Sequence, residues 1–163
     1  MVAMRIYLPL SAEDRTTLES SSSGIELIAG RAAWGVTGSA RTDNPDQDEE
    51  DLEYEAMQDA VHVALLSADA TARALVIAAD APDGDVAAAE EDGGAFGVEV
   101  RGTTRARIAS FHVTELDAVA AEQDDTDPAL LWFDASEGAD ALAYLEGTAG
   151  SGAASPLPNA PLA

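Results

Sequence analysis

An unbroken apolar run, Ala74–Ala79, constrains the fold of this chain more than any other stretch of its sequence. A short run without polar residues is typical of a strand that is buried on both faces of a sheet. The next five residues, Asp80–Gly84, include several types that favour turns, and they end the run. The run therefore predicts a buried strand, in which we expect Val76 and Ile77 to be almost fully buried.

Other segments also carry strand patterns, either as alternation of apolar and polar residues or as short apolar runs. The strands that these patterns predict are Arg5–Leu10, Phe96–Arg101, Arg107–Val113 and Ala129–Phe133. The segment Ile25–Thr37 is ambiguous, and Ala33–Thr37 within it could be a further strand. Gly38–Gln47 is expected to be a loop, and Val86–Gly94 is expected to be a loop that could include a helical turn.

Helical periodicity is clearest between Asp48 and Ala68, where apolar residues recur at three- and four-residue steps. The predicted apolar stripe consists of Tyr54, Met57, Val61, Ala64, Leu65 and Ala68. Shorter helices are expected at Ser11–Glu19, Glu115–Glu122 and Ser136–Leu145.

The resulting order is β-α-(β)-α-β-β-β-α-β-α, in which strands outnumber the helices that could connect them. It predicts an α+β or mixed α/β fold, with helices packed on a single mixed sheet. Residues 4–146 are expected to form one domain. The segment 147–163 is rich in Gly, Ala, Ser and Pro, and we expect it to be a disordered tail.

Acidic residues dominate the polar part of the chain. There are 31 Asp and Glu residues against eight arginines, without any lysine or cysteine, and the formal net charge is −23. Direct binding to nucleic acid or to an anionic membrane needs clustered basic residues, so the composition argues against both. The absence of cysteine excludes disulfides, and no apolar stretch is long enough for a membrane-spanning helix. We expect a cytoplasmic protein whose negative field favours a basic protein partner.

Four carboxylates near predicted strand ends form a candidate metal site. Asp80 and Asp134 each follow a predicted strand, and Asp83 and Glu137 lie close to them in sequence. If the two strands were parallel neighbours, these carboxylates would meet at the edge where α/β proteins place ligands. Hard cations such as Mg²⁺ or Ca²⁺ prefer such oxygen ligands. The alternative is that these residues serve turns and helix N-caps.

A second acidic stretch, Asp43–Glu55, holds eight carboxylates and no base. It fails the calcium-loop pattern, because Asp51 stands where that pattern needs a glycine. Acids at the start of a helix suit the helix dipole. We interpret this stretch as a solvated loop that leads into the long helix.

Ser110 and His112 share one face of a predicted strand, as a nucleophile and its base could. Residues two apart on a strand lie about 6.5–7 Å from each other. That spacing predicts that the two side chains are too far apart for a direct hydrogen bond, so we interpret His112, and likewise His62, as structural. Trp132 lies inside an apolar run and is expected to be a core residue, whereas Trp34 is less certain.

Five short motifs, taken in chain order, resemble those of a known family. They are Met4–Leu10 (MRIYLPL), Glu49–Tyr54 (EEDLEY), Val76–Pro82 (VIAADAP), Ala106–Val113 (ARIASFHV) and Leu130–Asp134 (LLWFD). Together they resemble a family of small acidic actinobacterial proteins that is catalogued only as a domain of unknown function. The resemblance implies a bacterial cytoplasmic protein and supplies no catalytic residues.

The sequence supports hypotheses from different functional classes. We favour a non-enzymatic binding or regulatory module that engages a basic protein partner, because no catalytic motif accompanies the negative field. One alternative is an enzyme that depends on Mg²⁺ or Ca²⁺ held by the four strand-end carboxylates. Another is an inhibitor that mimics nucleic acid with ordered rows of carboxylates. Genomic or halophilic background could also account for the acidity.

Overall fold

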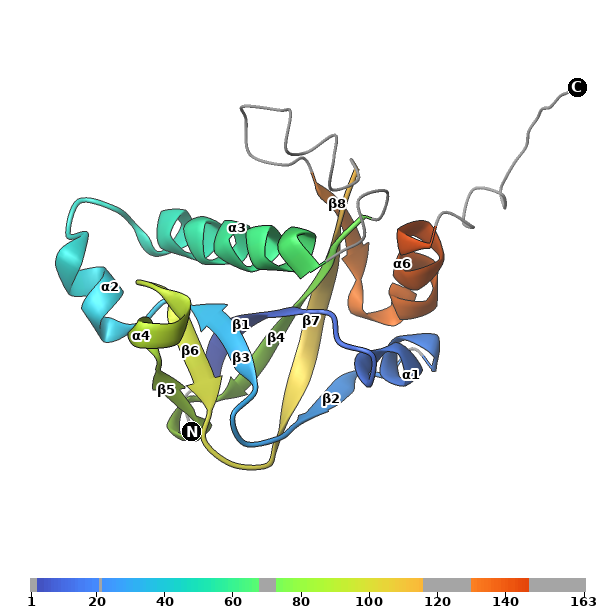
Figure 1. Cartoon of the computed structure of the whole chain (residues 1–163), viewed down its shortest axis with the longest axis horizontal. Coiled ribbons are helices and arrows are strands. Elements are labelled where there is room, and N and C mark those ends of the chain that lie inside the picture. The colour runs from blue at the N-terminus through green and yellow to red at the C-terminus, as the bar shows by residue number, and fades with distance from the viewer. Residues whose placement is uncertain (1–2, 21, 68–72, 116–129, 147–163) are drawn as a thin grey trace, which may run out of the picture.

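The computed structural model describes residues 3–20, 22–67, 73–115 and 130–146 of the chain. The helix expected at 115–122, apart from its first residue, and the tail expected at 147–163 lie outside these ranges. One eight-stranded sheet carries helices on both faces, which confirms the α+β class (Figure 1). All of its strand pairings are antiparallel, so the sheet is not the mixed one that the sequence predicts.

The strands are β1 (Ala3–Pro9), β2 (Gly24–Leu27), β3 (Ala32–Gly35), β4 (Leu75–Pro82), β5 (Val86–Ala88), β6 (Gly97–Val100), β7 (Thr104–Thr114) and β8 (Leu130–Asp134). The helices are α1 (Asp14–Glu19), α2 (Gly38–Asp43), α3 (Glu49–Ser67), α4 (Glu90–Gly93) and α6 (Gly138–Leu145), with short 3₁₀ turns at Asp83–Asp85 and Ala135–Glu137. Among these helices, none has both the length and the apolar character needed to cross a lipid bilayer.

The strands follow the order β2-β7-β4-β1-β3-β6-β5, and β8 lies beside β7. One edge of the long strand β7 pairs with β4. Its other edge pairs first with β2, through residues 104–107, and then with β8, through residues 110–114. The first strand, β1, lies inside the sheet between β3 and β4. Segments far apart in the sequence therefore meet in the middle of the sheet.

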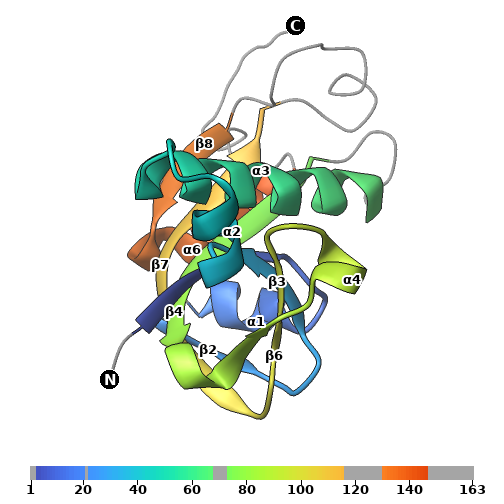
Figure 2. The ribbon, with the colours of Figure 1, turned by 90° about the vertical axis from the view of Figure 1, so that its left-hand side faces the viewer.

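Alternate side chains of the central strands supply a hydrophobic layer on each face of the sheet. On one face, Ile6, Ile77 and their neighbours pack against α1 and α6. On the other face, Tyr7 and Val76 belong to a second cluster together with buried residues of α3. Both views show α3 lying across this face of the sheet (Figures 1 and 2). Val76 and Ile77 are both 0% exposed, which confirms the prediction from the apolar run.

The long helix α3 begins and ends within one residue of its prediction. Most of the predicted stripe faces the sheet, since Val61 is buried and three further members are partly buried against the same core cluster, namely Met57, Ala64 and Leu65. Its buried residues include Leu52, Ala56, Ala60 and Val61. Tyr54, which the periodicity places in the apolar stripe, is 47% exposed. The distance between packed elements depends on the side chains at the contact, and small alanines favour close approach to the sheet. The buried face therefore extends beyond the predicted stripe to Leu52, Ala56 and Ala60.

Short elements occupy two segments where the sequence predicts loops. Helix α2 forms because the side chain of Thr37 accepts a hydrogen bond from the backbone N–H of Ala40 at 3.0 Å, capping the first turn. The side chain of Ala40 is then buried beneath the helix. Strand β5 pairs with β6 at one end of the sheet. Elements of three and six residues hold too few side chains to show a clear periodicity of apolar residues, so the sequence pattern does not predict them.

A buried ion pair joins α1 to the start of β3. The carboxylate of Asp14 is 3% exposed, and it accepts hydrogen bonds from Arg31 Nη2 at 2.8 Å and from Arg31 Nη1 at 3.3 Å. It also accepts from the backbone N–H of Ser11 at 2.9 Å. Arg31 Nη2 donates further to the carbonyl oxygen of Pro9 at 2.9 Å. This network holds the end of β1, the start of α1 and the β2–β3 connection together.

Candidate functional site

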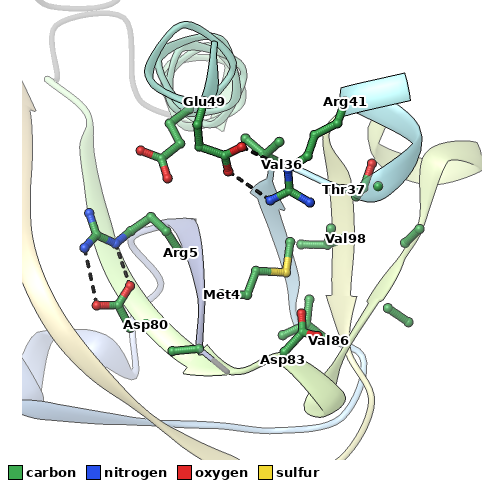
Figure 3. A pocket seen from close by; sticks show the side chains of 15 residues that line it. Met4, Arg5, Val36, Thr37, Arg41, Glu49, Asp80, Asp83, Val86 and Val98 are labelled. Atoms are coloured by element: carbon green, nitrogen blue, oxygen red, sulfur yellow. Dashed lines mark hydrogen bonds and ion pairs between the residues drawn. The ribbon is translucent and has the colours of Figure 1, made fainter. Parts of the chain in front are cut away.

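A cavity of about 650 Å³ opens beside the N-terminal half of α3. Its walls come from β1, β4, β5, β6 and the segment leading into α2, so residues from both halves of the chain meet there. Cavities of about 300–1,000 Å³ are the usual size for small-ligand sites. Figure 3 shows charged side chains on opposite sides of this cavity and Met4 between them.

Two guanidinium–carboxylate pairs line the cavity (Figure 3). Arg5 donates to Asp80 through Nε at 2.7 Å and through Nη2 at 3.3 Å. Arg41 donates to Glu49 through Nε and Nη2, both at 2.9 Å. The hydrogen bonds to these carboxylates raise the pKa of Arg5 and Arg41, and the bond from Arg41 lowers the pKa of Glu49. Both arginines in the cavity wall are therefore already neutralised.

Two further carboxylates of the cavity, on Glu53 and Asp83, have no such partner. Neither forms a hydrogen bond or ion pair with another residue in the described ranges. Burial raises the pKa of Glu53, and the negative charges of Glu49, Asp80 and Glu50 add to this effect, while Arg5 opposes it. The charged form of Glu53 is thus disfavoured in its own surroundings, and a cation brought next to it would be stabilised.

Most of the other residues that line the cavity are apolar, although Thr37 is among them. Val36, Val86 and Val98 contribute aliphatic side chains, and the side chain of Met4 is labelled among the lining residues in Figure 3. The cavity thus combines apolar walls with carboxylates that have no partner, an arrangement suited to a ligand with an apolar stem and a cationic end.

The structure separates the four residues of the predicted metal site. Asp80 and Asp83 line the cavity, whereas Asp134 and Glu137 lie at the end of β8. There, Asp134 accepts from the N–H of Ala135 and Glu137 accepts from the N–H of Asp134, each at 2.8 Å. Strand β7 lies between β4 and β8, so these two strands are not the parallel neighbours that the metal-site hypothesis requires. In the described part of the chain, no three or more His, Asp or Glu side chains form a group that could hold a metal ion.

The expectation that Ser110 and His112 are too far apart to bond is wrong. Ser110 Oγ and His112 Nε2 lie 2.9 Å apart, because the longer imidazole side chain bridges the distance between the two backbone positions. Burial, with a smaller contribution from the charge of Arg5, lowers the pKa of His112 to about 4. Ser110 is only 6% exposed and neither residue lines the cavity, so the pair stays a structural contact.

These shifts predict opposite effects of pH on stability. The folded-state pKa of His112 is depressed to about 4, so stability is lost as the pH falls below about 6.5, where the unfolded histidine takes up a proton. Glu53 and Asp59 have raised pKa values, so their destabilising charge is relieved as the pH falls through those values. His112 has the larger shift and is more deeply buried. We therefore expect the melting temperature to fall between about pH 7.5 and about pH 5.5.

Thermal melts of variants separate the two effects. His112→Gln lacks the buried imidazole, so its melting temperature should rise as the pH is lowered over the same range. In the double variant that also carries Glu53→Gln, this rise should be smaller. A wild-type melting temperature that rises on acidification would show that the carboxylates outweigh His112.

Sequence reasoning identified Asp80 and Asp83 but missed Arg5, Arg41 and Glu53. The missed signal lies in the acidic stretch, where Glu49 and Glu53 stand four residues apart and therefore share one face of α3. That face borders the cavity, so the stretch is more than a solvated entry to the helix.

Comparison with known proteins gives a family and no activity. A family model described as "Family of unknown function (DUF6912)" matches residues 4–143. No curated protein and no solved structure matches the chain.

Proposed function

This chain belongs, over residues 4–143, to the family of unknown function DUF6912, and from the charges around its cavity we propose that it is a non-enzymatic binding module that engages a basic protein partner. The proposal rests on one observation: the described part of the cavity wall holds carboxylates without a partner, whereas its arginines are paired. Both arginines are held by their own carboxylates, while Glu53 and Asp83 have no partner among the described residues.

The surroundings of the cavity support the same partner chemistry. The first turn of α3 carries Glu49, Glu50 and Asp51, and Asp83 and Asp85 lie in the turn that follows β4. The whole chain has a formal net charge of −23. A field of this sign speeds the encounter with a positively charged surface and repels acidic partners.

The proposal predicts that arginine and lysine hexapeptides bind and that a glutamate hexapeptide does not. Affinity measured by titration calorimetry should fall as NaCl is raised from about 50 mM to about 500 mM, because the interaction is electrostatic. Binding of a basic peptide that does not depend on salt would contradict the proposal.

Paired double variants test where the peptide binds. Glu50→Gln with Asp51→Asn removes two exposed charges next to the cavity, whereas Glu13→Gln with Glu19→Gln removes two at α1, on the opposite face of the sheet. The first pair should weaken binding several-fold more than the second. Equal losses would show that the whole surface attracts the peptide without a defined site.

A further inference from the structure

We propose that the face of β7 between β2 and β8 binds a small ligand that carries one phosphate and one flat ring, such as a nucleoside monophosphate. Arg105 and Arg107 donate to the phosphate, and the ring stacks on the indole of Trp132. The inference goes beyond the proposed function, because these residues lie outside the cavity lining and take a ligand of the opposite charge.

The fold leaves two of its arginines without a partner in the described ranges. All eight arginines lie in those ranges, and four of them form ion pairs with carboxylates. Arg73 and Arg101 donate to backbone carbonyl oxygens. Arg105 and Arg107 are exposed, and neither forms a hydrogen bond or ion pair with another described residue. Two unpaired cations on one strand of so acidic a chain are a local exception to its negative field, and they favour an anionic ligand there.

Gly24 brings the guanidinium of Arg105 to the side of Arg107. Three guanidinium atoms of Arg105, Nε, Cζ and Nη2, lie 2.6 to 2.8 Å from the position that a Cβ atom on residue 24 would occupy. Residue 24 is also the direct partner of Arg107 in the β2–β7 pairing. Since Cβ positions of directly opposed residues lie about 4.5–5.5 Å apart, the guanidinium of Arg105 lies next to the base of the Arg107 side chain. Two guanidiniums placed in this way can donate to two sides of one phosphate.

The carboxylates that stand opposite this pair do not neutralise it. Glu26 is opposite Arg105 in the β2–β7 pairing but forms no ion pair with it. Asp80 is opposite Arg107 on β4, and Arg5 already binds it through two hydrogen bonds. Glu26 is therefore the carboxylate that would oppose a bound phosphate most directly, and removing its charge should strengthen binding.

The same face of the sheet carries an exposed indole. Trp132 is 61% exposed and stands opposite His112 of β7, whereas α3 lies over β1, β3 and β4 on this side of the sheet. The β4 partners of His112 and Arg107 are Val76 and Asp80, four residues apart, so the two positions share a face and lie roughly 13 Å apart along the strand. Long side chains at both ends shorten this gap, so a ligand whose phosphate and ring are joined by a sugar can reach both.

The charge of the whole chain limits the ligand to a small anion. The formal net charge is −23, so every phosphate beyond the one that the two arginines neutralise would meet repulsion. Stacking of a ring on an aromatic side chain adds affinity that does not depend on charge. The combination favours a single nucleotide over a nucleic acid strand.

The test is a titration of the full chain with AMP, adenosine and inorganic phosphate at neutral pH, followed by NMR in a buffer without phosphate. AMP should shift backbone amides of β2, β7 and β8 in a saturable manner, and it should bind about tenfold more tightly than adenosine or phosphate. Failure of AMP to bind, or binding no tighter than that of either fragment, would overturn the proposal. A thymidine hexanucleotide that binds far more tightly than AMP would also overturn it, in favour of a site for single-stranded nucleic acid.

Substitutions locate the contacts. Arg105→Gln and Arg107→Gln should each weaken AMP binding about tenfold, the loss expected for a charge-assisted hydrogen bond. Trp132→Ala should weaken AMP binding by a similar factor without changing the affinity for inorganic phosphate. Arg15→Gln is the matched control, because it removes the same charge from α1 on the opposite face of the sheet, and it should change the affinity less than about twofold. Equal losses in Arg15→Gln and Arg107→Gln would show that AMP responds only to net charge.

Gly24→Ala tests the arrangement of the arginines while keeping both. Its Cβ would displace the guanidinium of Arg105, so AMP binding should weaken as it does in Arg105→Gln. The variant should fold normally, because the displaced atoms belong to the end of a flexible side chain. Gly102→Ala is its control, since an added Cβ there meets no atom within 4 Å. Unchanged AMP binding in Gly24→Ala, or weaker binding in Glu26→Gln, would contradict a phosphate held between the two arginines.

Discussion

Replacing Phe111 by alanine is expected to lower the free energy of unfolding by about 3–5 kcal/mol, which is among the largest effects of any single substitution in this chain. Phe111 is the largest of the fully buried side chains, with 0% exposed surface. It lies on β7, paired with Ile77 of β4 on one side and with Phe133 of β8 on the other. Truncation would leave a cavity in the middle of the sheet that rigid strands cannot close.

Urea denaturation of wild type and variant measures this loss. Trp132→Ala is the matched control, because Trp132 lies on the strand next to Phe111 but is 61% exposed. Its substitution should cost less than half as much. Equal losses for the two variants would mean that β8 is packed more tightly than its exposure indicates.

The second large effect is expected for Asp14→Ala, at about 3–5 kcal/mol. The substitution removes the acceptor of Arg31 and of the Ser11 N–H together, and it leaves the Arg31 guanidinium, whose side chain is 17% exposed, without its counter-ion. Asp14→Asn should cost less, since an amide oxygen can still accept one of these bonds.

The pair between Arg41 and Glu49 provides the comparison for Asp14→Ala. It also has two hydrogen bonds between guanidinium and carboxylate, but its side chains are 53% and 48% exposed. Glu49→Ala should therefore cost less than about 1 kcal/mol. If both substitutions destabilise the protein by similar amounts in urea, burial is not what makes the Asp14–Arg31 pair strong.

Short-range patterns of apolar and polar residues were enough to predict several of the strands and the longest helix. The apolar run at β4, the alternation in β6 and β7 and the bounds of α3 all follow from short-range patterns. The tryptophans show where such reasoning ends. Trp132 lies in an apolar run yet is 61% exposed, whereas Trp34, between small residues, is 7% exposed. Burial depends on which strand and which face a residue occupies, and Trp132 is on β8, which pairs with β7 alone among the described strands.

The candidate site was predictable only in part, for the same reason. Asp80 and Asp83 are visible as strand-end acids, but the partner of Asp80 is Arg5, 75 positions earlier in the chain. The link from Asp80 to Asp134 assumed adjacent strands, and the insertion of β7 between β4 and β8 breaks it. Strand order is decided by long-range pairing, which one sequence does not display.

The place of β1 inside the sheet has a consequence for synthesis on the ribosome. β1 precedes the other described strands in the chain, yet its neighbours are β3, at residues 32–35, and β4, at residues 75–82. The outer side of β4 is covered only when β7 has been made, up to Thr114. Until then, the apolar side chains of Ile6 and Leu8 lack the β7 side chains that complete their core cluster. Non-local pairing of this kind delays folding, so we expect the nascent chain to carry an unfinished sheet until β7 has been made. The high net negative charge would favour solubility of that intermediate.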